Sequence, residues 1–165
     1  MKSPNAGLRF AAVAAAFLML AACSSTDDAA GGSSSSTSGQ IAPGSQEDLV
    51  ANVGDRVFFD TDKSSLSDEA RATLQCQAAW MELYPNLTFT LEGHADERGT
   101  REYNLALGGR RANAAKDYLV SLGVNGGRLN TVSYGKERPV CLESNENCWA
   151  QNRRAVTIVA SGVGS

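Results

Sequence analysis

A chain of 165 residues, 42% of them hydrophobic, is long enough for one folded domain with appendages. A net charge of −3, with no concentrated basic patch, excludes the charge pattern of a nucleic-acid-binding protein. A single histidine far in sequence from the cysteines, and the lack of a CxxC motif, argue against a zinc site.

The first 22 residues have the organisation of a secretory signal. Lys2 and Arg9 form a short positive region, and an apolar run from Phe10 to Ala22 follows it and ends in small residues. The run is short and interrupted by Ala, which does not favour a membrane-spanning helix. We predict a signal peptide over residues 1–22; an N-terminal anchor that is never cleaved is the alternative.

The end of this run, LAAC (Leu20 to Cys23), resembles the lipobox of bacterial lipoproteins. The resemblance implies cleavage just before Cys23, a diacylglycerol on its thiol and an acylated new N-terminus. Each buried CH₂ contributes about 0.8 kcal/mol, so two or three acyl chains hold a small domain on a bilayer. Ser24 replaces the Asp that often retains such lipoproteins at the inner membrane, which favours the outer membrane. We expect no cofactor other than this covalent lipid.

Residues 23–45 form the predicted tether, which begins at the lipidated Cys23. The stretch from Ser24 to Ser45 is rich in Ser and Gly and nearly lacks large apolar side chains, so it cannot bury enough surface to fold. As a random coil it would span on the order of 25 Å. We interpret it as a leash that lets the domain reach away from a membrane.

Residues 46–165 alternate strand and helix patterns, as expected for one domain. Ser67 is placed to cap a helix that Pro85 ends. The expected strands are 55–60, 87–93, 128–135 and 153–160, and the expected helices are 67–84, 105–122 and a short turn around Trp149. The order β-α-β-α-β-(α)-β predicts an α+β two-layer sandwich with the helices on one face of a mixed four-stranded sheet.

The cysteines of the domain differ in context. Cys141 and Cys148 bracket a polar loop in an exported protein, which favours a disulfide between them; two free thiols are the alternative. Cys76 lies inside a helical pattern and is expected to be buried and inert.

The segment from Asp96 to Arg111 concentrates charge between a strand and a helix. Asp96 follows the strand end, where functional groups commonly lie, and Arg111 lies two to three turns into the helix. The two side chains could form a surface salt bridge, worth roughly 0–1 kcal/mol. Alternatively they could grip a zwitterion, with the arginine fork on a carboxylate and the aspartate on an ammonium.

Gly108 and Gly109 follow the start of this helical pattern. Each glycine costs about 1 kcal/mol relative to Ala in a helix interior, so their presence suggests that a ligand or a backbone approaches closely. The alternative is that the regular helix begins only after them.

The stretch GHADERGTREYNLALGGRRANAAKDYL resembles the peptidoglycan-binding domain of the OmpA-like family. VFFDTDKSSL before it, and VSYGKERP and NRRAV after it, occur in the family's order, and the similarity is strongest to the lipid-anchored members. The resemblance implies the family fold and a ligand, the meso-diaminopimelate of peptidoglycan stem peptides, whose side chain ends in an ammonium and a carboxylate.

The resemblance also implies roles for individual residues. Asp96 falls on the position that binds the ammonium and Arg111 on the one that binds the carboxylate. The family motif around Arg111 also covers Asn104, Leu107, Gly108 and Ala112, and Asp60 falls where the family lines the same cleft. Gly108 replaces the Ser common in the family, which removes a hydroxyl contact.

Other polar and aromatic residues are interpreted structurally. His94 has no catalytic partner and is expected to be a hydrogen-bonded structural residue. Arg153 and Arg154 could fix the loop beside the site or lie on a solvated strand edge. Glu97 and Arg98 are expected on the solvent rim, and Trp80 and Trp149 in the core or facing a partner.

We therefore expect a non-enzymatic tether, with lipid in the outer membrane and the domain on the wall. The resemblance places it in the Tol-Pal system, with TolB competing for an overlapping surface and a role in envelope constriction at division. An enzyme acting on the wall would need a metal cluster, a nucleophile–base pair or poised carboxylates, and the sequence offers one His and one unassigned Cys. An assembly partner that never touches the wall is the third possibility.

Overall fold

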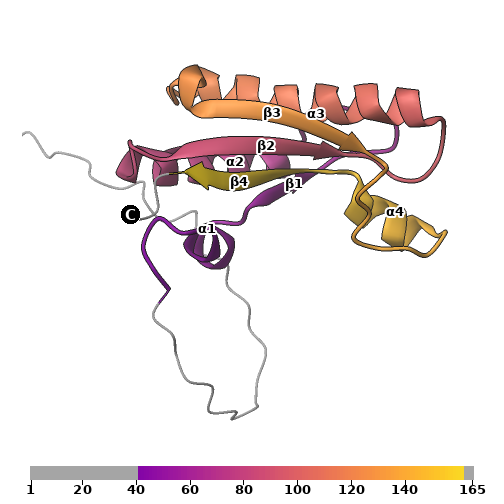
Figure 1. Ribbon diagram of the computed structural model, residues 1–165, viewed down its shortest axis with the longest axis horizontal. Coiled ribbons are helices and arrows are strands. Elements are labelled where there is room, and N and C mark those ends of the chain that lie inside the picture. The colour runs from indigo at the N-terminus through magenta and orange to yellow at the C-terminus, as the bar shows by residue number, and fades with distance from the viewer. Residues whose placement is uncertain (1–40, 162–165) are drawn as a thin grey trace, which may run out of the picture.

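The computed structural model describes residues 41–161, arranged as a sheet with two long helices along one face (Figure 1). The predicted signal peptide, Cys23 and most of the tether lie outside the described residues. Within residues 41–161, no helix has the length and apolar character that a membrane span requires.

Four strands form a single sheet in the order β1-β4-β2-β3. Strands β2 and β3 are parallel, whereas β4 lies antiparallel between β1 and β2. The strands are β1 Arg56–Phe58, β2 Thr88–His94, β3 Leu129–Gly135 and β4 Arg154–Ser161. The helices are α1 Gln46–Asn52, α2 Asp68–Leu83, α3 Arg101–Ser121 and α4 Glu146–Asn152, with a 3₁₀ turn, η1 Gly126–Arg128, before β3. The predicted mixed four-stranded α+β sandwich is confirmed.

The two long helices begin at capping residues. The Ser67 Oγ accepts a hydrogen bond from the Ala70 N–H at 3.1 Å, as the sequence predicted for α2. In α3, the Thr100 Oγ1 accepts from the Tyr103 N–H at 3.2 Å. Helix α3 therefore begins four residues before the expected position 105, because its first turn is polar and shows no apolar periodicity.

The hydrophobic core lies between the sheet and helices α2 and α3. Phe89 and Leu91 alternate along β2 toward the helices, and neither is exposed to solvent. Leu74 from α2 and Leu119 from α3 close over them. The core thus fixes α3 against β2 and sets the position of the loop that joins them.

Gly93 of β2 and Gly108 of α3 let the helix lie directly on the sheet. A Cβ on Gly93 would stand 1.8 Å from the Gly108 carbonyl oxygen, and one on Gly108 would stand 2.4 Å from the Ser133 Oγ. Both glycines of the helical pattern lie inside α3, so the alternative of an irregular lead-in is wrong. The close approach at Gly108 is made by backbone and by Ser133.

Helix α1 was not expected, and it shortens the predicted tether. The Ser45 Oγ caps α1 by accepting from the Asp48 N–H at 3.1 Å, and both Gly44 and Ser45 are buried. Asp48 in turn accepts hydrogen bonds from the Gly44 N–H and the Trp80 indole. The fold therefore includes residues that the sequence analysis assigned to the end of the tether.

The Gln46 side chain continues the sheet beside β4, where the short β1 has ended. Its Nε2 donates to the Thr157 carbonyl at 3.2 Å, and its Oε1 accepts from the Val159 N–H at 2.8 Å. The amide thus satisfies backbone groups that would otherwise form an open sheet edge.

Cys141 and Cys148 are joined by a disulfide at the start of α4. The Asn152 side chain holds the same turn, accepting from the N–H groups of Val140 and Cys141. Cys76 lies only half-buried on α2, and none of the described cysteines is a free thiol, so the expectation of a buried, inert thiol is wrong.

Candidate ligand-binding site

A cavity of about 260 Å³ opens where the loop after β2 meets the start of α3. The loop after β1 forms its opposite wall. We call it the β2–α3 cavity; its lining residues are Thr61, Asp62, Asp96, Arg98, Gly99, Tyr103, Asn104 and Leu107. Three of these residues, Asp62, Asp96 and Arg98, have charged side chains, so the cavity suits a small polar ligand.

Asp96 lies in the wall of this cavity and is 7% exposed. Its Oδ1 accepts from the Arg98 N–H and Nε, both at 3.1 Å, and its Oδ2 accepts from Arg98 Nη2 at 2.7 Å. Arg153 Nη1 lies 3.5 Å from the same Oδ2. Burial alone would raise the pKa of Asp96, but the hydrogen bonds from Arg98 outweigh it and lower the pKa, so the group is a carboxylate at neutral pH.

Arg111 lies beneath the cavity and is 0% exposed. Its Nε, Nη1 and Nη2 donate to the carbonyl oxygens of Lys63, His94 and Asp60 at 2.9, 2.9 and 3.1 Å. Its guanidinium carbon lies 5.3 Å from the centre of the Phe59 ring. Burial lowers the pKa of Arg111 to about 10, so it still carries a positive charge at neutral pH.

Asp96 and Arg111 are therefore brought to the same end of the domain without being paired to each other. Within residues 41–161, the ion-pair partners of Asp96 are Arg98 and Arg153. The alternative of a surface salt bridge between Asp96 and Arg111 does not describe this geometry. The arginine fork closes on three backbone carbonyls, and Arg111 does not line the cavity, so the expectation that this fork itself grips a ligand carboxylate is wrong for this structure. Arg111 instead ties the loop after β1 to the end of β2, and its charge acts on the cavity from below the surface.

The other residues of the family motif have separate positions. Asn104 and Leu107 line the cavity, and Asn104 Nδ2 also donates to the Arg98 carbonyl at 2.8 Å. Gly108 and Ala112 are buried where α3 packs on β2 and do not line the cavity. Their place in the motif is explained by helix packing.

Asp60 lies outside the β2–α3 cavity, contrary to expectation. Its carboxylate is 76% exposed, pairs with Lys63 at 3.1 Å and faces a larger hollow of about 520 Å³ between β1 and α4. Only its backbone carbonyl reaches Arg111. The neighbouring residues Thr61 and Asp62 line the cavity in its place.

Sequence reasoning missed Thr61, Asp62 and Arg98. Asp62 has a φ of 59°, in the left-handed region, and this turn directs the chain along the cavity wall. Two aspartates around a Thr directly after a strand are a turn signal that could have indicated this position. Arg98 is exposed, as expected for a residue on the rim, but its guanidinium also pairs with Asp96 and lies 4.2 Å from the centre of the Trp149 ring.

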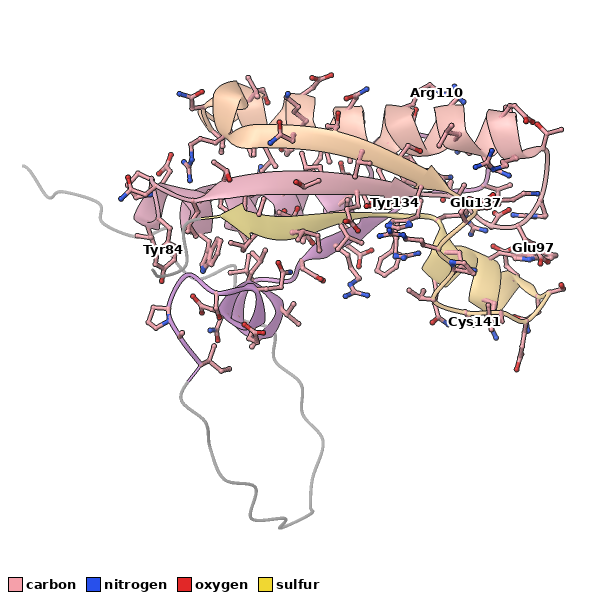
Figure 2. All side chains as sticks on the ribbon, viewed as in Figure 1. Tyr84, Glu97, Arg110, Tyr134, Glu137 and Cys141 are labelled. Atoms are coloured by element: carbon pink, nitrogen blue, oxygen red, sulfur yellow. A yellow bond between two sulfur atoms is a disulfide. The ribbon has the colours of Figure 1, made fainter. Side chains whose placement is uncertain are left out.

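Helix α4 supports the loop that carries Asp96 and Arg98. Figure 2 shows Glu97 on this loop beside α4, and Glu97 Oε1 accepts from the Trp149 indole at 3.0 Å. Arg153, at the end of α4, donates from Nε to the Phe59 carbonyl and from Nη2 to Glu146. Arg153 thus fixes the loop beside the site, which was one of the two roles expected for it, and does not lie on a solvated strand edge.

His94 is buried on the face of the sheet that α2 and α3 do not cover. Its ring packs 5.6 Å from Tyr134, and neither ring nitrogen has a hydrogen-bond partner, so the expectation of a hydrogen-bonded histidine is wrong. Burial, together with the positive charges of Arg154, Arg138 and Arg56, lowers the pKa of His94 to about 4. Among the described residues, no cluster of acidic, His or Cys side chains could hold a metal ion.

The sequence from residue 58 to residue 154, which spans the end of β1 to the start of β4, matches the model of the OmpA family. A peptidoglycan-associated lipoprotein of Rhizobium meliloti is 61% identical over 78% of this chain and 72% of its own length. One from Agrobacterium fabrum is 59% identical over 74% of this chain and 69% of its own. The chain belongs to the OmpA family, among the peptidoglycan-associated lipoproteins.

Solved structures agree with this membership of the OmpA family. The crystal structure of the peptidoglycan-associated lipoprotein from Burkholderia pseudomallei superposes with a TM-score of 0.63 at 44% identity, covering 64% of this chain and 90% of that one. The C-terminal domain of Helicobacter pylori MotB has a TM-score of 0.62 at 18% identity, which shows the shared fold alone. The OmpA-like lipoproteins are a non-enzymatic family, and the chain is not an enzyme.

Proposed function

We propose that the protein binds peptidoglycan non-covalently through the β2–α3 cavity, and that its ligand is the meso-diaminopimelate of an uncross-linked stem peptide. The free end of that residue carries an ammonium and a carboxylate on one carbon. Asp96 pairs with the ammonium. The positive charge of Arg111, beneath the cavity, attracts the carboxylate.

The observation that carries this proposal is the state of Asp96. A carboxylate that is 7% exposed, has a lowered pKa and still lines an open cavity is a site for a cation. A buried positive charge lies close to it, because Arg111 donates a hydrogen bond to the carbonyl of His94, two residues before Asp96. Charges of both signs at one small cavity match a ligand that bears the opposite pair.

Attachment at the other end of the chain completes the function. A lipid on Cys23 would hold the protein in the outer membrane, and the stretch after it would let the domain reach the wall. Confinement near the wall raises the effective concentration of the domain, so a weak individual site suffices for stable tethering.

The cellular role follows from the same attachment. We infer that the protein belongs to the Tol-Pal system and links the outer membrane to the wall during envelope constriction at cell division. TolB, the partner expected from the family resemblance, would compete for the surface around the cavity. The names of the curated relatives, peptidoglycan-associated lipoproteins, support the wall as the common ligand.

Co-sedimentation with insoluble peptidoglycan tests this function. Asp96→Asn keeps the shape of the side chain and removes its charge. We expect it to weaken the affinity for peptidoglycan at least tenfold, because a loss of about 1.4 kcal/mol in binding free energy already suffices. Asp117→Asn, on an exposed position of α3, is the matched control and should sediment like wild type. Unchanged sedimentation of Asp96→Asn would place the wall-binding surface elsewhere.

A further inference from the structure

The Asp96 carboxylate is already fully hydrogen-bonded by the protein itself. Its Oδ1 accepts two hydrogen bonds from Arg98, and its Oδ2 accepts one from Arg98 and a longer one from Arg153. A carboxylate offers about four acceptor positions. A ligand ammonium can therefore reach Asp96 only if one of these donors leaves.

The Arg98 side chain is the donor that can leave. Its side chain is 38% exposed, whereas that of Arg153 is 7% exposed. Arg153 is also fixed by hydrogen bonds to the Phe59 carbonyl and to Glu146. The remaining donor, the Arg98 N–H, belongs to the loop backbone that the Asn104 side chain holds.

Arg98 would stay at the cavity after leaving Asp96. It lines the cavity, its Nη2 lies 3.3 Å from Thr61 Oγ1, and Trp149 lies against its guanidinium. Trp149 itself is held by Glu97, so it can keep the displaced guanidinium near the cavity mouth by a cation–π contact. A guanidinium there presents two parallel N–H donors to a carboxylate.

We infer that Arg98 determines specificity in the proposed site by exchanging partners, from Asp96 in the free protein to the carboxylate of the ligand. This inference rests on the proposed function. The ligand ammonium takes the place of Arg98 on Asp96, and the ligand carboxylate takes the place of Asp96 on Arg98. In the free protein Asp96 and Arg98 pair with each other, whereas in the complex each pairs with one charge of the ligand, so binding of a zwitterionic centre adds one ion pair.

Partner exchange makes the site reject a ligand that has only the ammonium. A lysine side chain would displace Arg98 from Asp96 and offer it nothing in return. Lysine can bind only to the fraction of molecules in which Arg98 has left Asp96. For a partly exposed ion pair this requirement weakens the affinity for lysine about three- to tenfold. The diaminopimelate side chain avoids this loss because its carboxylate re-pairs Arg98.

The test measures two ligands against two forms of the full chain in detergent, by calorimetric titration. The ligands are a stem peptide with meso-diaminopimelate and the same peptide with lysine at that position. Arg98→Ala should bind the lysine peptide about three- to tenfold more tightly than wild type and the diaminopimelate peptide about equally well. The preference for diaminopimelate should therefore fall by that factor. Arg98→Gln, which keeps a polar side chain of similar length, should give the same fall.

The matched control is Arg101→Ala. Arg101 is 68% exposed, pairs with Glu137 at 3.4 Å and does not line the cavity. The substitution Arg101→Ala removes a positive charge three residues from Arg98, and the variant should keep the wild-type preference for the diaminopimelate peptide. If Arg98→Ala keeps the wild-type preference, or weakens both peptides equally, partner exchange is refuted while the proposed function stands. If wild type binds neither peptide, the proposed function fails and the inference fails with it.

Discussion

Arg111 donates from Nη1 to the carbonyl oxygen of His94, two residues before Asp96, so the buried arginine holds the backbone from which Asp96 projects. Its other nitrogens hold the carbonyls of Asp60 and Lys63 on the facing loop. One side chain thus joins both walls of the β2–α3 cavity and adds a positive charge to that of Arg98, which lines the cavity. Shape and charge of the site depend on the same residue.

Arg111→Ala is expected to destabilise the fold as well as the site. Removal of the guanidinium leaves the buried carbonyl of His94 and the part-buried carbonyls of Asp60 and Lys63 without their donor, and it removes a fully buried side chain. We therefore expect a loss of about 3–5 kcal/mol in the free energy of unfolding. Arg111→Lys should recover only part of this, because an ammonium cannot span the positions of the fork. Urea denaturation measures both losses.

Arg110→Ala is the control for this pair. Arg110 is exposed on the outer side of α3, where Figure 2 labels it, and its loss should change the free energy of unfolding by less than about 0.5 kcal/mol. Equal effects at positions 110 and 111 would contradict the role assigned to the buried arginine.

Two adjacent glycines of α3 should respond in opposite directions to the same substitution. At Gly108 an added methyl would meet the Ser133 Oγ and the Gly93 carbonyl, so Gly108→Ala should cost about 1–3 kcal/mol through overpacking. At Gly109 the nearest atom would be the Ser133 Cβ at 3.9 Å, so Gly109→Ala should stabilise by about 0.5–1 kcal/mol through helix propensity. Thermal unfolding of both variants checks the sign of each change.

Acid should destabilise the protein through His94, the one histidine of the chain. Its pKa is about 4 in the folded state and about 6.5 when unfolded, so the unfolded state binds the extra proton first as the pH falls. Stability should therefore decrease from about pH 6.5 down to about pH 4 and level off for this group below that. The loss should be on the order of 3 kcal/mol, because each unit of difference in pKa contributes about 1.4 kcal/mol.

His94→Phe isolates this effect from the titration of carboxylates. The ring nitrogens make no hydrogen bond, and Glu92, 3.7 Å from Nε2, would pair only with a protonated ring, so a phenyl ring beside Tyr134 removes no hydrogen bond at pH 7. The variant should lose the pH dependence between pH 5 and 6.5 and keep its stability at pH 7. A wild-type NMR titration that gives His94 a pKa near 6.5 would refute the prediction.

Most of the fold could be predicted because its signals are local. Alternation of Phe89 and Leu91 identified β2, and the capping Ser67 located the start of α2. Helix α1 was missed because it spans only two turns and follows directly on a Ser/Gly-rich stretch, although Ser45 with Asp48 three residues later is a capping signal.

The site could be predicted only in part, because its contacts connect distant segments. Asp96 and Arg111 were identified as members of one site, but the partners of Arg111 include Lys63, which lies 48 positions away along the chain. No local pattern predicts that a fork will close on those carbonyls. Arg98 was expected on the solvent rim and is exposed there, but its pairing with Asp96 was missed for a related reason. An exposed arginine in a loop has the same local pattern whether it is solvated or covers a carboxylate.

We propose that charges of both signs at the β2–α3 cavity recognise the free end of meso-diaminopimelate. The decisive measurement is a calorimetric titration of wild-type protein with a stem peptide that contains meso-diaminopimelate, compared with the same peptide that contains lysine. We expect tighter binding of the diaminopimelate peptide, because lysine lacks the carboxylate that Arg98 and Arg111 attract. Equal affinity for the two peptides would show that the cavity does not recognise the carboxylate.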